Sequence, residues 1–175
     1  MNIERNLQAT EESARAAAPI SRSGVNLRPA YLIATWFGLG YSKFAPGTMG
    51  ALGTLPLFFI LRPWGAGALF AMALVLTGAG VFCAQRVASE LADDDPSLVV
   101  IDEVAGVLLA LAFVADGPLW LQALAFLAFR LLDILKPGPI ATLERLRPKG
   151  IGIMADDVAA GLLAGVLCRL ILIYL

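Results

Sequence analysis

The chain has 175 residues, enough for one domain; 59% of them are hydrophobic and the mean hydropathy is +0.79. Soluble domains contain about 45–50% apolar residues, so the excess indicates that much of the apolar surface faces lipid. The net charge of −1 offers no basic field to a nucleic-acid partner. The absence of histidine excludes Ser-His-Asp triads, phosphohistidine chemistry and histidine-ligated zinc, which leaves carboxylates, lysine, hydroxyls or an oxygen-ligated metal ion for any catalysis.

The first segment of the chain, residues 1–30, is polar and rich in Ala, Ser, Arg and Glu. It lacks the apolar core of a secretory signal peptide. We therefore expect a mobile cytoplasmic tail at 1–30, followed by one helical domain at 31–175.

Five apolar segments follow, separated by breakers such as Arg62-Pro63 and Asp116-Gly117-Pro118. They cover about residues 49–61, 65–84, 99–114, 118–135 and 158–175, and the second continues as a polar helix to about residue 91. A membrane-spanning helix needs about 20 apolar residues. The second, fourth and fifth segments come close, whereas the first and third are short enough to be tilted, re-entrant or buried among the others. No strand-like alternation competes, so the pattern predicts an all-α, membrane-associated helical bundle.

The basic residues fall almost entirely on one side if all five segments cross a bilayer. Of the 13 Lys and Arg residues, only Arg62 and Arg169 belong to the other side. The positive-inside rule then places the basic side in the cytoplasm. If the first and third segments dip in and return, this side is still a plausible cytoplasmic face, but the count loses force.

The same side also collects acidic residues at the boundaries of the apolar segments. Asp102 and Glu103 open the third segment, Asp133 closes the fourth, and Asp156 and Asp157 open the fifth. Carboxylates at such boundaries are costly to desolvate, and their convergence on one face favours a hard cation such as Mg²⁺. The alternative is that the acids only stabilise helix N-termini. That alternative explains adjacent pairs of acids poorly, and it does not explain Asp133, which lies near a C-terminus.

Arg130 and Lys136 lie on either side of Asp133. Arg130 precedes it by three residues, hence on the same helix face, and the Pro-Gly-Pro run after Lys136 ends the helix. Two interpretations stay open: a structural ion pair followed by a turn, or a site in which Lys136 contacts a substrate phosphate while Asp133 binds metal. The run Asp93–Asp95 is predicted to be a solvated turn.

A glycine-rich stretch, residues 38–50, leads into the first apolar segment. Free backbone N–H groups at a helix N-terminus bind phosphate. Thr48 would cap the helix, and Lys43 would add positive charge. A tight turn with a threonine cap accounts for the same residues without a ligand.

Four motifs in this order resemble those of the phosphatidylglycerophosphatase A family. Residues 129–140 (FRLLDILKPGPI) are similar to its F-R-x-x-D-x-x-K-P-x-P-I signature, and residues 100–106 (VIDEVAG) to its D-E-x-x-G segment. Residues 152–161 (GIMADDVAAG) resemble its G-x-M-x-D-D-x-x-A-G segment, and residues 45–50 (APGTMG) its glycine-rich opening. The resemblance covers residues 36–175.

The resemblance implies an all-helical fold with a central helix surrounded by others. It also implies Mg²⁺-dependent hydrolysis of phosphatidylglycerophosphate to phosphatidylglycerol, by a multi-pass protein of the bacterial inner membrane whose site faces the cytoplasm. Its substrate would be a membrane phospholipid, with no nucleic-acid partner. The catalytic residues that carry over are Asp102, Glu103, Asp133, Lys136, Asp156 and Asp157. The five acids among them are the expected metal ligands, and the expected phosphate-binding residues are Lys43, Gly47, Thr48, Arg130 and Lys136.

The resemblance does not assign base, ligand or nucleophile among the acids. A carboxylate could take the proton of an attacking water, or an aspartate could form a covalent phosphoenzyme. Two other functions use the same features: a small membrane cation transporter or channel, because acids in a membrane bundle also mark ion paths, and a phosphatase for a soluble substrate. The glycine-rich stretch and Lys136 argue against a cation path, which gains little from either.

Overall fold

The computed structural model describes residues 28–174, which form helices and turns with no strand among them. Most of the tail predicted at 1–30 lies outside the described residues. The α-helices are α2 (Pro29–Ala34), α3 (Pro46–Gly53), α4 (Leu55–Leu61), α5 (Ala66–Leu91), α6 (Ile101–Ala112), α7 (Leu119–Leu135), α8 (Gly138–Leu143) and α9 (Lys149–Tyr174). The all-α prediction is confirmed.

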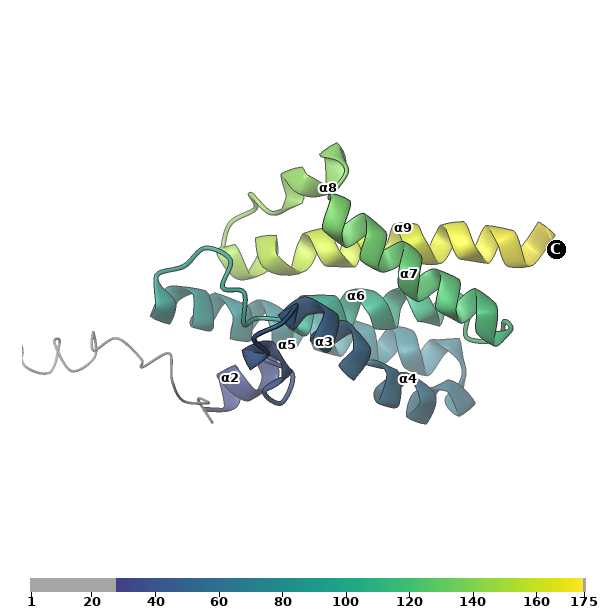
Figure 1. Cartoon of the computed structure of the whole chain (residues 1–175), viewed down its shortest axis with the longest axis horizontal. Helices are drawn as coiled ribbons and strands as arrows, with labels where there is room; N and C mark the ends of the chain where they lie inside the picture. Colours follow the sequence, from purple (N-terminus) through teal and green to yellow (C-terminus); the bar gives the residue numbers. More distant parts are fainter. Residues whose placement is uncertain (1–27, 175) are drawn as a thin grey trace, which may run out of the picture.

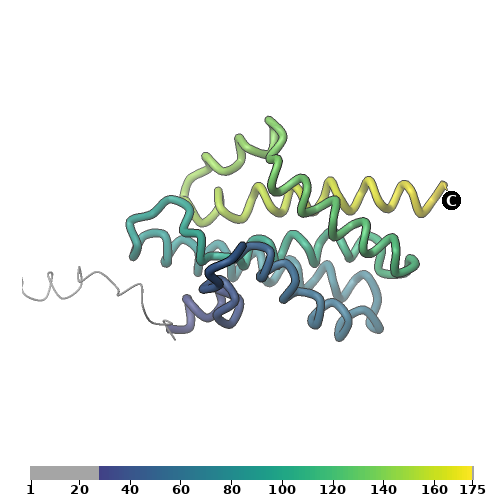
Figure 2. The backbone as a smooth tube through the Cα atoms, viewed as in Figure 1, coloured from purple at the N-terminus to yellow at the C-terminus, as the bar shows by residue number. Residues whose placement is uncertain are grey.

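The helices run back and forth along one long axis (Figure 1 and Figure 2). Helices α3 and α4 act as one pass, because Thr54 between them keeps helical dihedral angles. One end of the bundle carries α8 and the connector 92–100; we call it the α8 end. The other end carries the α4–α5 turn, the connector 113–118 and the last residue of α9; we call it the C-terminal end.

Two helices, α5 and α9, are long and apolar enough to cross a bilayer. Each has 26 residues, and their mean hydropathies are 2.0 and 1.9. Only 28% and 33% of their most apolar stretches are buried, whereas a core helix of a soluble protein is mostly buried. Large apolar side chains such as Phe82 (78% exposed) and Leu74 (73% exposed) project from α5. Together these features indicate a membrane protein.

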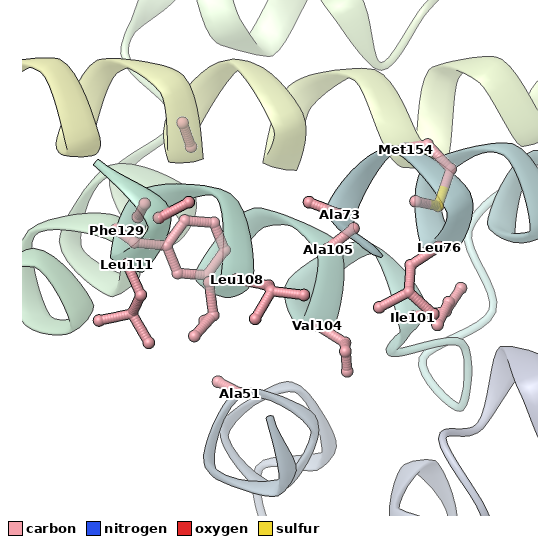
Figure 3. Close-up of a cluster of buried hydrophobic side chains, with 14 of the residues drawn as sticks. Ala51, Ala73, Leu76, Ile101, Val104, Ala105, Leu108, Leu111, Phe129 and Met154 are labelled. Carbon is pink, nitrogen blue, oxygen red and sulfur yellow. The ribbon is translucent and has the colours of Figure 1, made fainter. Parts of the chain in front are cut away.

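Helix α6 is the central helix, as expected, and it packs against α3, α5, α7 and α9. Val104 and Leu108 are fully buried on it, and Leu111 is nearly so. Phe129 of α7 packs near the later part of α6, and Met154 of α9 packs near its beginning (Figure 3). Together they complete this core. Burial of such side chains stabilises the fold by about 1.5–3 kcal/mol each.

Helices α6 and α9 approach closely because both carry glycine at the crossing. A Cβ atom on Gly161 would lie 2.4 Å from the carbonyl oxygen of Gly106, and one on Gly106 would lie 2.7 Å from the carbonyl oxygen of Asp157. Gly106 follows Glu103 by three residues, and Gly161 follows Asp157 by four. One helical turn from this crossing, the acids of the two helices must therefore meet.

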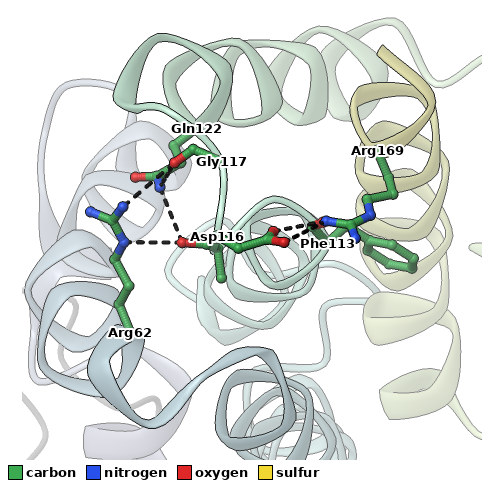
Figure 4. A network of polar contacts seen from close by, with 7 residues as sticks. Arg62, Phe113, Asp116, Gly117, Gln122 and Arg169 are labelled. Carbon is green, nitrogen blue, oxygen red and sulfur yellow. Dashed lines mark hydrogen bonds and ion pairs between the residues drawn. The ribbon is translucent and has the colours of Figure 1, made fainter. Parts of the chain in front are cut away.

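The C-terminal end is held by arginine side chains from two helices (Figure 4). Arg62, which follows α4, donates from Nε to the carbonyl oxygen of Ala115 at 3.0 Å. Arg169 of α9 pairs with Asp116 at 2.8 Å. The two basic residues that the sequence separated from the rest thus share the end of the bundle opposite α8.

The start of α9 differs from the sequence-based expectation. The helix begins at Lys149 rather than near residue 158, so Asp156 and Asp157 lie two turns inside it. The alternative in which these two acids stabilise a helix N-terminus is therefore wrong. The extra turns, residues 149–157, carry a lysine, two glycines and two acids among their apolar residues, which lowers their hydropathy. They pack on α5, where the N–H of Gly150 donates to Gln85 Oε1 at 2.9 Å.

The N-terminal region also differs from expectation in two places. Helix α3 begins at Pro46, after Ala45 in a left-handed conformation, and no side chain caps it. Thr48 consequently lies within the first turn, and its predicted capping role is wrong. Helix α2 was not predicted at all, and its Tyr31 and Ala34 are buried against the rest of the bundle.

A methyl group at the α6–α9 crossing should destabilise the protein. We expect Gly106→Ala to lower the free energy of unfolding by about 1–3 kcal/mol, because the Cβ meets the Phe129 ring and the Asp157 carbonyl. Gly78→Ala is the matched control: nothing lies within 4 Å of its Cβ, and it should be neutral or stabilising by up to about 1 kcal/mol. Thermal unfolding in detergent measures both, and equal midpoints would contradict the close approach.

Candidate active site

An acidic cavity of about 190 Å³ opens at the α8 end. Residues from α3, the 92–100 connector, α6, α7 and α9 line it, together with Glu144 just after α8. All six residues predicted to be catalytic line this one cavity: Asp102, Glu103, Asp133, Lys136, Asp156 and Asp157. With Asp95 and Glu144, seven carboxyl groups surround a single lysine, so the cavity as built attracts cations.

Three of these carboxyl groups form a compact set of metal-ligand type. One oxygen each from Asp102, Glu103 and Asp157 lies within 4.8 Å of the others. Asp102 Oδ1, Glu103 Oε2 and Asp157 Oδ2 are buried and have no hydrogen-bond partner. Buried oxygens without partners are costly, and a hard divalent cation would satisfy all three. The residues present therefore fit a cation of the Mg²⁺ type, although they do not identify the ion.

The start of α6 places Asp102 and Glu103 in this set. The N–H of Val100, the residue before the helix, donates to the carbonyl of Ala34 at 2.8 Å, and Ile101 is fully buried. The helix is thereby anchored at its first residue, and both acids fall in its first turn. Its positive dipole end favours their charged forms, as the capping alternative expected, but does not satisfy their orphaned oxygens.

Asp133 belongs to a different pairing. It forms an ion pair with Arg130 in which both side chains are largely buried. The other terminal nitrogen of Arg130 donates to Thr48 Oγ1 at 3.4 Å, which joins α7 to α3. The predicted structural ion pair is present, and it orients a carboxylate that also lines the cavity. Asp133 is outside the compact set of three, so its role as a metal ligand stays a prediction.

Lys136 pairs with Asp156 and not with Asp133. Its Nζ lies 2.7 Å from Asp156 Oδ2 and 3.4 Å from Glu144 Oε2. Burial alone would lower the pKa of Lys136, but the hydrogen bond and attraction from Asp156, with further attraction from Glu144 and Asp95, raise this pKa above its ordinary value. The ammonium group is therefore charged at neutral pH. The interpretation in which Lys136 stands beside Asp133 is corrected.

The glycine-rich stretch reaches the cavity through Gly47. A Cβ atom there would lie 2.0 Å from Glu103 Oε1, so a side chain at this position would displace the Glu103 carboxylate. Thr48 does not line the cavity, and its hydroxyl accepts a hydrogen bond from Arg130; its contact with phosphate stays a prediction. Lys43 is exposed and does not line the cavity either; its contact with phosphate stays a prediction.

Two cavity residues were not anticipated from the sequence. Asp95 lines the cavity although the 93–95 run was expected to be a solvated turn. That expectation does describe Asp94, which is exposed and pairs with Arg147 and Lys149. Glu144 was also missed. The available signal was topological: both residues lie in connectors that join segments at the same end as the predicted acids.

The family model described as phosphatidylglycerophosphatase A matches residues 32–172 of the chain. A Bacteroides thetaiotaomicron protein named putative phosphatidylinositol-3-phosphatase is 40% identical over 151 residues, covering 80% of this chain and 93% of that protein. Phosphatidylglycerophosphatase A of Escherichia coli is 34% identical over 142 residues, covering 79% of this chain and 81% of the relative. The Haemophilus influenzae enzyme of the same name is 35% identical over 140 residues, covering 79% and 85%.

No solved structure matches the chain. The family match nevertheless extends over nearly all of the described residues, and it includes every residue that lines the acidic cavity. The protein belongs to the phosphatidylglycerophosphatase A family and is a phosphatase acting on a phosphate monoester.

Proposed function

We propose that this phosphatase removes the terminal phosphate of phosphatidylglycerophosphate, with Mg²⁺ held in the acidic cavity, in phospholipid biosynthesis. The observation that carries the proposal is the set of orphaned carboxylate oxygens of Asp102, Glu103 and Asp157. A phosphate monoester carries a charge of about −1.5 to −2 at neutral pH. It would be repelled from a cavity with seven carboxyl groups and one lysine unless a cation offset that charge.

Asp102, Glu103 and Asp157 are the residues that would hold this ion. When bound, Mg²⁺ supplies Lewis-acid polarisation of phosphate oxygens and lowers the pKa of a coordinated water. The protein contributes a dry, shaped site: Gly47 leaves room beside Glu103, and the first turn of α3 presents backbone N–H groups that have no helical acceptor.

Lys136 is the cation that the chain itself supplies to the substrate. Asp156 and Glu144 hold its ammonium group at the cavity wall. A protonated lysine has three donors and no acceptor, so it binds phosphate oxygens and not the metal ion. Negative charge that grows on those oxygens during transfer strengthens the contact, which lowers the transition state more than the ground state.

Asp133 is our proposed proton acceptor. Arg130 fixes the orientation of its carboxylate, and it lines the cavity outside the compact ligand set. In the proposed step, water oxygen bonds to phosphorus, its proton passes to an Asp133 carboxylate oxygen, and the bond from phosphorus to the glycerol oxygen breaks. The leaving oxygen takes up a proton from solvent water to become the alcohol, and Asp133 releases its proton to solvent. Attack by a carboxylate to form an aspartyl-phosphate is the alternative.

We also propose a multi-pass topology in the bacterial inner membrane, with the α8 end in the cytoplasm. Most basic residues of the described chain lie at that end, whereas Arg62 and Arg169 lie at the other. Positive charge accumulates on cytoplasmic segments. The cavity would then open to a lipid headgroup of the cytoplasmic leaflet.

A second candidate substrate is phosphatidylinositol 3-phosphate, because the Bacteroides relative carries that activity in its name. Both substrates are membrane lipids with a terminal phosphate monoester, so the same cavity chemistry serves either. A cation channel has less support. The central helix between the two ends of the bundle is packed with fully buried apolar side chains such as Val104 and Leu108, which leaves no polar path along it.

The direct test is phosphate release by the purified full chain. We expect release from phosphatidylglycerophosphate with Mg²⁺ and none with EDTA, because an uncompensated acidic cavity repels the substrate. Phosphate release from phosphatidylinositol 3-phosphate, measured in parallel, shows whether this lipid is also a substrate. Undiminished release in EDTA would contradict the metal site, and no release from either lipid would contradict the proposed substrate class.

Two substitutions should separate metal binding from phosphate binding. Asp157→Asn removes a ligand charge, so activity should be lost at ordinary Mg²⁺ concentrations. Lys136→Met removes a phosphate contact, and we expect kcat to fall by about 10²–10³-fold. Its Mg²⁺ requirement should be unchanged or lower, because loss of a nearby positive charge favours cation binding. Asp94→Asn, outside the cavity, is the control and should be mild.

A Mg²⁺ titration of each variant provides the measurement. Full rescue of Lys136→Met at high Mg²⁺ would exclude the phosphate contact and leave only a structural pairing with Asp156. Equal losses in all three variants would mean that the site is misplaced.

Topology can be tested by cysteine accessibility in a background without Cys83 and Cys168. Arg145→Cys, at the α8 end, should resist an impermeant thiol reagent in intact cells and react after lysis. Pro118→Cys, exposed at the C-terminal end, should react in intact cells. The reverse pattern would put the site on the opposite face of the membrane.

A further inference from the structure

An apolar groove of about 300 Å³ runs along the outside of the bundle between the α3–α4 pass and α7. Leu52, Leu55 and Phe59 form one wall, and Phe126 and Leu127 form the other. Leu111 of the central helix contributes to its floor. Of the ten residues that line it, only Gln122 is polar. None of these ten residues lines the acidic cavity.

The groove and the acidic cavity lie along the same seam. On the first wall, Thr48, Leu52, Leu55 and Phe59 are spaced four, three and four residues apart, which places them on one helical face.

The second wall repeats this arrangement. Ala123, Phe126, Leu127 and Arg130 share one face of α7, at successive helical spacings. Thr48 and Arg130 contact each other at the head of the seam. Along both helices, therefore, a polar pair beside the acidic cavity gives way within about one turn, roughly 6 Å, to the apolar side chains of the groove.

We propose that this groove binds an acyl chain of the lipid substrate while its phosphate occupies the acidic cavity. The inference rests on the proposed function. A phosphate-bearing lipid has a charged head joined to apolar chains, and the seam presents the matching order of surfaces. Arg130 and Lys136, the cations nearest the junction, complement an anionic head.

The dimensions of the groove also fit one chain. From Leu127 to Leu119 the α7 wall is about 12 Å long, at 1.5 Å per residue. One leaflet of the hydrocarbon core is about 15 Å thick. Gln122, the one polar residue of the lining, is 3% exposed, and its amide nitrogen donates to the carbonyl of Gly117 at 2.9 Å. The groove thus accepts most of a chain that enters from the head side.

Binding of an acyl chain in the groove predicts that the reaction kinetics depend on acyl-chain length. Substrate held by both head and chain is oriented before chemistry, so chain contacts should lower KM or raise kcat only for lipids long enough to enter. A groove that only holds bulk lipid would give no dependence of activity on the substrate's chain length. A groove covered by a second copy of the protein would be closed to lipid.

The test places the phenyl ring of a phenylalanine in the groove by substitution. Ala123 lines it and is exposed; Ala123→Phe should obstruct it. Ala71→Phe, on the exposed surface of α5 and outside every cavity described here, is the matched control. Both are compared with wild type on dioleoyl and dibutyryl forms of phosphatidylglycerophosphate, whose heads are identical.

We expect Ala123→Phe to lower kcat/KM for the dioleoyl form by about tenfold or more, through loss of several methylene contacts. Its activity on the dibutyryl form should equal that of wild type, which also shows that the variant is folded. Ala71→Phe should leave both rates unchanged. An unchanged ratio of the two rates in Ala123→Phe would overturn the proposal.

A second measurement does not depend on turnover. Wild-type protein is irradiated with phosphatidylglycerophosphate that carries a diazirine in its acyl chain, and the labelled peptides are mapped. Labels should concentrate in 52–59 and 119–127, and unlabelled phosphatidylglycerophosphate should remove them while phosphatidylcholine should not. Labels spread over all exposed helices would indicate bulk lipid. Their absence from the groove, with cross-links between copies there, would indicate a dimer interface.

The two measurements separate the hypotheses. If wild type releases no phosphate from either lipid, the proposed function fails, and the labelling pattern alone decides whether the groove binds the chain. If wild type is active but the labels lie elsewhere, the groove fails and the proposed function stands.

Discussion

The backbone contact between α6 and α9 at Gly106 and Gly161 determines where chemistry can occur in this molecule. Side chains at that crossing would push the helices apart, because a Cβ on either glycine would lie 2.4–2.7 Å from a facing carbonyl oxygen, and the acids one turn away would meet less closely. The contact brings Asp157 to Asp102 and Glu103, with ligand oxygens within 4.8 Å. Such charges repel one another, so hydrophobic packing along the central helix holds together a site that is unfavourable alone. A bound cation would relieve this repulsion and stabilise the fold by mass action.

The distribution of charge follows from the same architecture. The central helix is acidic in its first turn and apolar afterwards. Acids therefore gather at the α8 end, while the polar contacts of Arg62 and Arg169 hold the connector at the C-terminal end. Because apolar packing separates the two ends, substrate can reach the cavity only from the α8 end or sideways between helices. In the proposed topology, the headgroups of the cytoplasmic leaflet lie at this end of the bundle.

Much of this arrangement is readable from the sequence, but only at the level of helices. Hydropathy and breakers predict the all-α bundle, and the acids at segment boundaries predict their own convergence. The partner of Lys136 is not readable, because the choice between Asp133 and Asp156 depends on how α8 returns the chain to α9. The early start of α9 was missed for a related reason: residues 149–157 pack on α5 through Gly150 at Gln85 and Met154 at Gly80, and no local window records that packing. Asp95 was missed because a run of acids resembles a solvated turn unless the end of the bundle it occupies is known.

A lipid phosphatase must meet two opposing requirements within a few ångströms. The ion and the phosphate need charged oxygens and a lysine, whereas the acyl chains need a surface without polar groups. Helices α3 and α7 meet both by changing side-chain character along one face, with Thr48 and Arg130 at the transition. Arg130, which pairs with Asp133, therefore lies about one helical turn from Leu127 in the wall of the apolar groove. In the proposed binding mode, Arg130 both orients the proposed proton acceptor Asp133 and faces the phosphate of a lipid whose chain lies in the groove. Binding of the chain would then also align the phosphate for hydrolysis.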